Sequence, residues 1–203
     1  MKVVIIDYGM GNINSITSTL YHLGVNEVCL SSNYSSLKSA DKLILPGVGS
    51  YRQAMMVIKN NNIDNYLRDL VLNEKKPLLG ICLGMQLMGQ SSTEDGFTNG
   101  LGFIGANCTK FEQNLKVPHV GFNQVKINNK LRLYEGFNVK EVDFYFTHSY
   151  KLTYDKNINQ CNCNYSKDFI ASFEYKNICG VQYHPELSQT NGLKVLNNFL
   201  NNF

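Results

Sequence analysis

Residues 77–88 read Pro-Leu-Leu-Gly-Ile-Cys-Leu-Gly-Met-Gln-Leu-Met, and this stretch decides the fold. Its first half is a short continuous apolar run, which is typical of a strand buried on both faces of a parallel sheet. From Leu83 to Met88 the pattern is that of a helix. A buried strand that passes through a tight turn straight into a helix is the repeating unit of an α/β fold.

The same alternation precedes this stretch. Strands are expected near residues 2–7, 25–30 and 42–45, and helices near 12–23, 51–60 and 63–74. Strands that alternate with helices predict a doubly wound, parallel sheet, and such a sheet places its sites at the carboxyl ends of its strands.

The second half of the chain changes character. Shorter strands are expected at 101–111, 121–127, 142–154, 169–175 and 178–183, and a last helix at 189–200. Asn- and Lys-rich turns between them predict an antiparallel or mixed extension of the sheet. The chain contains no repeat, linker or Pro/Gly hinge, so residues 1–203 are expected to form a single domain with a mixed sheet, mostly parallel in its N-terminal half.

Composition narrows the class of protein. The 203 residues are 43% hydrophobic and 17% charged, which suits one globular domain and excludes a disordered chain. A net charge of +3 without a run of Lys or Arg argues against a nucleic-acid partner. No apolar stretch approaches the ~20 residues of a membrane span. The opening Met1–Asp7 reaches an acid too early for a signal peptide, so a cytoplasmic enzyme is expected.

The cysteines argue against disulfides and metals. Six are present, at 29, 82, 108, 161, 163 and 179. Without a secretion signal a disulfide framework is not expected, and no paired Cys or His knuckle predicts a zinc site. Cys161 and Cys163 alternate, which places both sulfurs on one face of a strand as small apolar side chains. No glycine-rich phosphate loop is complete, so no cofactor is expected.

The turn Gly80-Ile81-Cys82-Leu83-Gly84 is the cysteine version of the Gly-x-Ser-x-Gly nucleophile elbow. Small flanking residues let the backbones approach closely. The turn would hold Cys82 in the cleft at the positive end of a helix, where the thiolate is favoured over the thiol. The plain alternative is a buried cysteine at the end of a strand.

A base for this nucleophile is found in Gln182-Tyr183-His184-Pro185-Glu186, directly after an apolar strand. Pro185 ends the strand and stiffens the turn, so His184 and Glu186 can project toward one edge of the sheet. A carboxylate two residues away can hold the second imidazole nitrogen. Cys82, His184 and Glu186 are therefore the candidate nucleophile, base and orienting group of a triad.

A third element, Leu45-Pro46-Gly47-Val48-Gly49, follows the buried strand 42–45. Its glycines allow backbone N–H groups of Gly47, Val48 and Gly49 to turn into the cleft. These donors and the N–H of Leu83 could hold an oxyanion. The plain alternative is a structural turn.

Six segments together resemble the class I (triad) glutamine amidotransferases, which have a flavodoxin-like α/β fold. They are Asp7-Tyr8-Gly9-Met10-Gly11-Asn12, Leu45–Gly49, Gly80-Ile81-Cys82-Leu83-Gly84-Met85-Gln86, Lys116-Val117-Pro118-His119, Phe146-Thr147-His148-Ser149-Tyr150 and Gly180–Glu186. The resemblance runs in order from residue 2 to about residue 200. Within this family, the opening segment and the segments around His119 and His148 are similar to the glutaminase subunits of imidazole glycerol phosphate synthases.

The resemblance implies an activity. Cys82 would attack the side-chain amide of glutamine, His184 would pass a proton to the departing ammonia, and Glu186 would orient His184. A thioester would form, and water would release glutamate. The backbone donors at residues 47–49 and 83 would meet the oxyanion after residues 47–49 rotate.

The resemblance also implies ligand and partner contacts. Gln86, Glu94, Ser149 and Tyr150 match groups that hold the amino and carboxylate ends of L-glutamine. Asn12, Pro118, His119 and Asn123 match the synthase-facing side of a heterodimer. The partner would be a (β/α)8-barrel synthase subunit of histidine biosynthesis. It would receive ammonia through a protected channel and form imidazole glycerol phosphate and an aminoimidazole carboxamide ribotide.

Two departures from the family pattern lie on that docking side. Phe122 stands where Trp is usual, and Leu187 follows Glu186 where Lys is usual. The loss of the indole ring of Trp and of the positive charge of Lys suggests a different partner surface. They leave a second interpretation open, a paralogous glutaminase that supplies ammonia for modifying a sugar of a bacterial surface polysaccharide.

Two other classes of protein are disfavoured by the residues themselves. A catalytically silent binding subunit would be expected to lack one of Cys82, His184 and Glu186. A cysteine peptidase would need a cleft for an extended chain, whereas Gln86 and residues 148–150 suit a small amino acid. The acceptor of the ammonia, the partner and the activity of the isolated chain are left open by the sequence.

Overall fold

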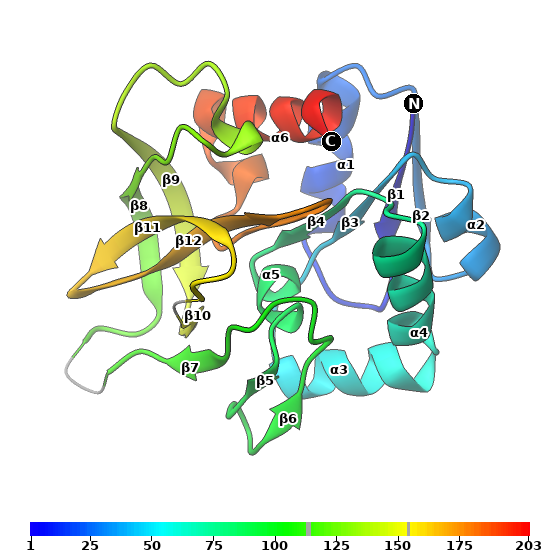
Figure 1. Ribbon diagram of the computed structural model, residues 1–203, viewed down its shortest axis with the longest axis horizontal. Helices are drawn as coiled ribbons and strands as arrows, with labels where there is room; N and C mark the ends of the chain where they lie inside the picture. Colours follow the sequence, from blue (N-terminus) through cyan, green and yellow to red (C-terminus); the bar gives the residue numbers. More distant parts are fainter. Residues whose placement is uncertain (113–114, 154) are drawn as a thin grey trace.

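The computed structural model describes residues 1–112, 115–153 and 155–203 (Figure 1). In these residues a nine-stranded sheet has the order β2-β1-β3-β4-β13-β12-β11-β8-β9, and a four-stranded sheet has the order β10-β7-β5-β6. None of the described helices is long and apolar enough to cross a bilayer.

The N-terminal half forms the expected doubly wound layer. Its parallel strands are β1 (Lys2–Ile6), β2 (Glu27–Ser31), β3 (Lys42–Leu45) and β4 (Leu78–Ile81). The helices between them are α1 (Ile13–His22), α2 (Tyr34–Lys38), α3 (Tyr51–Asn60), α4 (Ile63–Leu67) and α5 (Leu83–Leu87), with a π-helical turn at Arg68–Asn73. Apart from the short α2, which the sequence pattern did not indicate, these elements were predicted, and the parallel sheet is confirmed.

The second half extends the sheet in the mixed manner that was expected. The strand β13 (Ile178–Val181) pairs in parallel with β4. Beyond it, β12 (Lys167–Tyr175), β11 (Asn159–Tyr165), β8 (His119–Lys126) and β9 (Glu141–His148) are antiparallel. Because Ile81 pairs with Val181, the next residues of both strands, Cys82 and Gln182, emerge at the same edge of the sheet.

The small sheet is built from short strands. They are β5 (Ser91–Ser92), β6 (Thr98–Asn99), β7 (Cys108–Lys110) and β10 (Tyr150–Leu152). The predicted strand 142–154 is divided at Ser149 into β9 and β10, and residue 154 lies outside the described residues.

The expected strand at 101–111 was wrong except at β7. The N–H of Leu101 donates to the carbonyl of Leu87 at 2.8 Å, and that of Phe103 donates to Met88 at 2.9 Å. These bonds satisfy carbonyls at the end of α5, which a helix cannot pair by itself. The apolar pattern of this segment therefore reflects burial against α5 and not pairing in a sheet.

Each face of the large sheet has its own core. Along β1, Val3 and Ile5 contribute to one core while Val4 and Ile6 contribute to the other, as the two-residue period of a strand requires. The helices α1 and α6 (Gln189–Asn202) cover one face, where they lie close together in Figure 1, and α2 to α5 cover the other.

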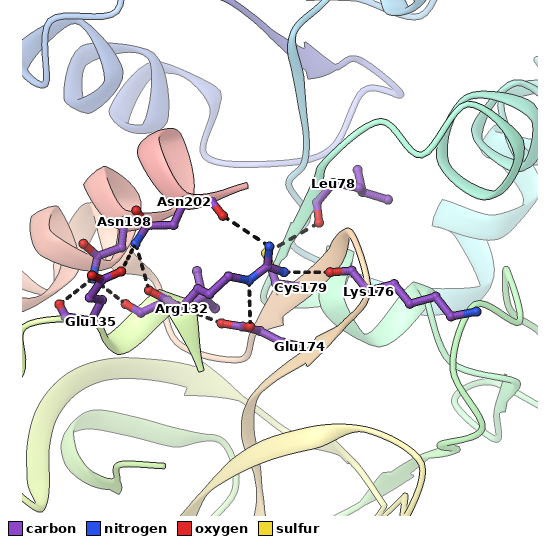
Figure 2. Close-up of polar contacts among 9 residues, drawn as sticks. Leu78, Arg132, Glu135, Glu174, Lys176, Cys179, Asn198 and Asn202 are labelled. Carbon is purple, nitrogen blue, oxygen red and sulfur yellow. Dashed lines mark hydrogen bonds and ion pairs between the residues drawn. The ribbon is translucent and has the colours of Figure 1, made fainter. Parts of the chain in front are cut away.

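A polar cluster ties α6 and the 3₁₀ turn η2 (Arg132–Tyr134) to β12 (Figure 2). The carboxylate of Glu174, which is 6% exposed, accepts the N–H of Leu133 at 2.7 Å and Nε of Arg132 at 3.4 Å. Asn198 of α6 donates to the carbonyl of Leu133 at 2.9 Å. Glu174, Leu133 and Asn198 are buried, although the Arg132 side chain is 42% exposed, so the buried groups depend on one another for their hydrogen bonds.

We expect Glu174→Ala to lower the free energy of unfolding by about 2 kcal/mol, since it leaves a buried N–H of Leu133 without an acceptor. Urea unfolding measures this loss. The matched control is Glu27→Ala, which removes an exposed pair with Lys2 and should have no measurable effect. Equal losses in the two variants would contradict the prediction.

Candidate active site

Cys82 lies in a strained turn between β4 and α5. Its φ and ψ are 54° and −111°, a region that side-chain-bearing residues rarely occupy. Close backbone contacts impose this turn. A Cβ on Gly84 would lie 1.8 Å from the carbonyl oxygen of Leu45, and one on Gly80 would lie 2.8 Å from the backbone nitrogen of Met85. The two glycines that flank the elbow are therefore required by space.

His184 and Glu186 follow β13 and are buried beside this turn. Nδ1 of His184 lies 2.9 Å from Oε1 of Glu186, and the side chains are only 4% and 0% exposed. The Glu186 oxygen also accepts Nδ2 of Asn12 at 3.4 Å. Among the described residues, Nε2 of His184 has no hydrogen-bond partner. The imidazole is thus held at one nitrogen and has the other available.

The charge on His184 is favoured by its neighbours. Burial alone would lower the pKa of the imidazole, but the polar and charge interactions with Cys82 and Glu186 raise it to about 10. Nε2 forms no direct hydrogen bond with the thiol in this conformation, and the proximity of Cys82 supports the charge. An imidazolium that faces a sulfur atom is the charge arrangement of an activated cysteine.

A cavity of about 310 Å³ opens over Cys82. Its lining includes the predicted nucleophile Cys82 and residues predicted to bind the oxyanion, the glutamine or the partner. These are Val48, Gly49, Leu83, Gln86, Glu94, Pro118, Ser149 and Tyr150, and Thr147 and His148 complete the lining. Its volume suits a ligand of the size of one amino acid. Gly47, the remaining predicted member of the oxyanion segment, is not part of its wall.

Residues 46–49 do not leave the Leu83 donor free. The N–H of Leu83 donates to the carbonyl of Gly47 over 3.4 Å. Behind it, the hydroxyl of Tyr8 donates to the carbonyl of Pro46 at 2.6 Å. Tyr8 belongs to the first recognised segment, but sequence reasoning gave it no role. In this conformation a carbonyl occupies the side of Leu83 from which an oxyanion would be bound.

Gln182 is a site residue that sequence reasoning missed. It is fully buried, and its Nε2 lies 3.7 Å from Sγ of Cys82. Its Oε1 accepts Nε2 of Gln86 at 2.9 Å, and the same Gln86 nitrogen donates to the carbonyl of Tyr150 at 2.8 Å. Because Gln182 lies two residues before His184 just beyond a strand, alternation could have indicated its proximity to the site.

Glu94 lines the cavity. Its carboxylate accepts the N–H of Tyr51, the first residue of α3, at 3.0 Å. Burial is the largest influence on its pKa, which is raised above the ordinary value of a glutamate. Since Glu94 is the carboxylate in the cavity lining, it favours a ligand with a positive group there.

The residues expected to face a partner are placed at different depths. Pro118 is exposed, Asn12 and Asn123 are half-buried, and His119 is only 4% exposed. The ring of His119 lies 3.1 Å from that of His148, nitrogen to nitrogen, and bonds Asn123 on its other side at 3.2 Å. His119 is therefore buried, and its hydrogen bond to the half-buried Asn123 leads from it toward the surface.

The same two histidines are kept neutral by burial. It lowers the pKa of His119 to about 4 and that of His148 to about 3. Among the described residues no cluster of three His, Cys, Asp or Glu side chains could hold a metal ion.

Comparison with known proteins defines the class. Residues 4–203 match the family Glutamine amidotransferase class-I. A crystal structure of a glutamine amidotransferase, 17% identical, has the same fold, with a TM-score of 0.76 over 97% of this chain and 96% of that one. The structure of PurLQS from Thermotoga maritima, 19% identical, matches with a TM-score of 0.72 over 99% and 98%. The chain belongs to the class I glutamine amidotransferase family, and it is a glutaminase of the triad type.

Its relatives narrow the group. The chain is 42% identical to imidazole glycerol phosphate synthase subunit HisH 1 of Campylobacter jejuni (strain RM1221), with 98% of each chain covered. It is 39% identical to subunit HisH of Aquifex aeolicus (strain VF5), with 98% of this chain and 96% of the relative covered.

We expect the two neutral histidines to make stability depend on pH. In the unfolded chain their pKa is near 6.5, so their contribution is complete above that pH and is lost as the pH falls toward about 4. Urea unfolding near neutral pH and at about pH 5 tests this. His119→Phe, which cannot be protonated, should lose less stability over that interval than the unmodified protein.

The exposed His22 provides the control, since His22→Gln should leave the pH dependence unchanged. An identical decline in His119→Phe and the unmodified protein would show that His119 does not titrate on unfolding.

Proposed function

We propose that this chain is the glutaminase subunit of an imidazole glycerol phosphate synthase of histidine biosynthesis. As one domain in the cytoplasm, it would hydrolyse glutamine and pass the ammonia to a (β/α)8-barrel synthase subunit. The observation that carries the glutaminase chemistry is the buried His184, held by Glu186 at 2.9 Å and raised in pKa by Cys82 beside the cavity. The identity with HisH subunits along the chain supports the pathway.

The chemistry proceeds through a covalent intermediate. Sγ of Cys82 attacks the side-chain amide carbon of glutamine, and the carbonyl oxygen takes the negative charge. The imidazolium of His184 gives its Nε2 proton to the amide nitrogen, and ammonia leaves as the thioester forms. His184 then takes a proton from water, which attacks the thioester and displaces the Cys82 thiolate; the acid formed ionises to glutamate, and the thiolate–imidazolium pair is restored. Glu186 holds the imidazole throughout and is a positioning group.

The oxyanion would be stabilised only after a backbone change. The Leu83 N–H donates to the Gly47 carbonyl at present, so residues 47–49 must turn before that donor can meet the oxyanion. One such donor is worth roughly 100-fold to 1000-fold in rate. The turn would also let an N–H of the 47–49 segment enter the cleft. A partner that favours the turned state would therefore switch the glutaminase on.

Glutamine would be held by its charged ends. Glu94 suits the α-ammonium group because it is the carboxylate of the lining. Elsewhere in the lining, Ser149 and Tyr150 would supply polar groups for the α-carboxylate. Gln86, whose nitrogen bonds the Tyr150 carbonyl, would fix that wall and face the ligand with its remaining oxygen.

We expect Cys82→Ala to abolish glutamine hydrolysis without unfolding the protein, because only the nucleophile is removed. His184→Ala should lose activity more than Glu186→Ala, by roughly tenfold or more, since Glu186 does not carry the proton itself. Glutamate release measures all three, and Cys29→Ser is the control for replacing a cysteine outside the site. Hydrolysis at the normal rate in Cys82→Ala would remove the assignment of the nucleophile.

An exposed apolar patch supports a docking partner. On β8, Val120 and Phe122 are 56% and 50% exposed, and Leu187, in the turn after the triad, is 42% exposed. Phe122 lines a small pocket with Ser188 and Gln189, which places it beside that turn. Exposed apolar groups that gather near a site are typical of an interface.

The same patch favours the second candidate function. Phe122 and Leu187 replace the ring and the charge that are usual in the histidine branch. Some relatives also carry a numeral, such as HisH 1 and HisH 2, in their names. A paralogous glutaminase for surface-polysaccharide sugars would use the same triad with a different partner.

One assay decides between the histidine-pathway function and the surface-polysaccharide function. It measures glutamate release by the chain alone and then with a histidine-pathway synthase subunit plus its ribonucleotide ligand. We expect the subunit to stimulate hydrolysis by about 100-fold, the size of one oxyanion donor. Phe122→Asp should abolish the stimulation and leave basal hydrolysis unchanged, while Val139→Asp, an equally exposed control, should not affect either. Hydrolysis that ignores the subunit would favour the surface-sugar branch.

A further inference from the structure

A chain of hydrogen bonds runs from the cavity wall through the interior to β11. The carbonyl of Tyr150 lies 2.7 Å from Nδ1 of His148, and Nε2 of His148 lies 3.1 Å from Nδ1 of His119. Nε2 of His119 lies 3.2 Å from Nδ2 of Asn123, which also donates to the carbonyl of Asn164 at 3.0 Å. The triad chemistry uses none of these four contacts.

The groups at both ends of this series of hydrogen bonds require the same direction of proton donation. The Tyr150 carbonyl can only accept, so Nδ1 of His148 must carry the proton, and in the neutral ring Nε2 then accepts. At the other end, Nδ2 of Asn123 is fixed as the donor because its second bond is to a carbonyl and because Oδ1 accepts the N–H of Gln124 at 2.8 Å. His119 must therefore accept at Nε2 and donate from Nδ1 to His148.

A second proton on either ring would leave one of these contacts with two N–H groups face to face. Burial already disfavours such a charge, since it lowers the pKa of both rings. Aromatic packing holds the rings in place. His119 is stacked between Phe146 and Tyr165, with ring centroids 5.0 and 4.1 Å away. The hydrogen bonds therefore allow one pair of tautomers for His119 and His148, and the aromatic packing holds the His119 ring in one orientation.

The Tyr150 carbonyl is the point where this chain meets the active site. It accepts from Gln86 as well as from His148, and Gln86 is bonded through Gln182 to the sulfur of Cys82. The carbonyl just before it, that of Ser149, accepts the N–H of Phe111 at 3.2 Å. The backbone that lines the proposed glutamine pocket is thus aligned from both sides.

We propose that His119, held by Asn123, is a positioning residue that donates to Nε2 of His148 and so keeps the Nδ1–H of that ring on the carbonyl of the glutamine-binding wall at Tyr150. This inference rests on the proposed glutaminase function and deepens it. On β8 the inward His119 and Asn123 alternate with the exposed Val120 and Phe122, so the strand that would meet a partner also aligns the substrate wall. His119 acts through His148 and does not touch the substrate.

Two substitutions separate positioning from packing. His119→Phe keeps an aromatic ring between Phe146 and Tyr165 but loses the donor to His148. His119→Asn loses the ring but can place an amide N–H where Nδ1 was. We expect His119→Phe to raise the KM for glutamine about tenfold with kcat changed less than about twofold, as for one hydrogen bond lost beside a buried acceptor. His119→Asn should restore KM to within about threefold of normal.

The outcomes separate this inference from the proposed function. If KM is normal in His119→Phe and raised in His119→Asn, the ring and not the hydrogen bond matters, and the positioning role is overturned. A normal KM in both variants overturns it as well. If the unmodified protein releases no glutamate with or without the synthase subunit, the proposed function fails instead. Thermal unfolding of both variants shows whether each is folded at the assay temperature.

A spectroscopic measurement tests the same inference without activity. In ¹⁵N spectra of the unmodified full chain at neutral pH, His119 and His148 should both show the neutral Nδ1–H tautomer. In His119→Phe the Nε2 signal of His148 should shift toward that of an imidazole nitrogen without a hydrogen bond, and in His119→Asn it should not. An Nε2–H tautomer at either histidine in the unmodified protein contradicts the inference.

Discussion

The parallel pairing of β4 with β13 is the constraint on which the site depends. Gly80 lies opposite Gly180, and both must be glycine because Met85 of α5 packs onto them. A Cβ on Gly180 would lie 2.8 Å from Cγ of Met85. This register brings Cys82, the proposed nucleophile, from one strand and His184, the proposed base, from the other to a single edge. The N–H of Cys82 completes the pairing by donating to the carbonyl of Val181 at 2.8 Å.

The contacts that hold the turn also restrict what can change near it. Gly84 is packed on the carbonyl of Leu45, which leaves no space for a larger side chain, and the pairing of Leu45 with Gly80 joins the end of β3 to the strand that leads into the elbow. Beyond Gly47 the chain becomes exposed, since Val48 is 43% exposed and a Cβ on Gly49 would meet no atom within 4 Å. The closely packed turn of the proposed nucleophile and the exposed end of the proposed oxyanion segment are therefore adjacent in the fold. This combination allows rate to be controlled without disturbing the triad.

Local patterns predicted most of this fold because the signals were strong. The buried runs 42–45 and 78–81 have no polar residue that could face water except Lys42, and the glycine-flanked Cys82 has few structural alternatives. A strand was wrongly predicted at residues 101–107, because burial against a helix gives the same apolar run as burial in a sheet. The hairpin of β5 and β6 could not be predicted, since strands of two residues carry no period.

The site was predicted in its chemistry more than in its connections. Cys82, His184 and Glu186 could be found because each lies at a strand end with a distinctive neighbour. By contrast, the bond of Asn12 to Glu186 joins residues 174 positions apart, and no local pattern encodes such a contact. The bonds of Gln182 and His148 were equally hidden, because a polar residue inside a strand pattern does not reveal what it bonds across the sheet.

Three buried histidines show how neighbouring groups determine whether the pKa of a buried imidazole is raised or lowered. His184, His148 and His119 are all less than 7% exposed, and burial lowers the pKa of each. Only His184 faces ionisable groups of the opposite charge, the thiol of Cys82 and the carboxylate of Glu186, and its pKa is raised. The other two meet a carbonyl, an amide and each other, which give a proton no counter-charge. One kind of side chain can therefore be charged at His184, as the proposed proton carrier requires, and neutral and directional in its hydrogen bonds at His148 and His119.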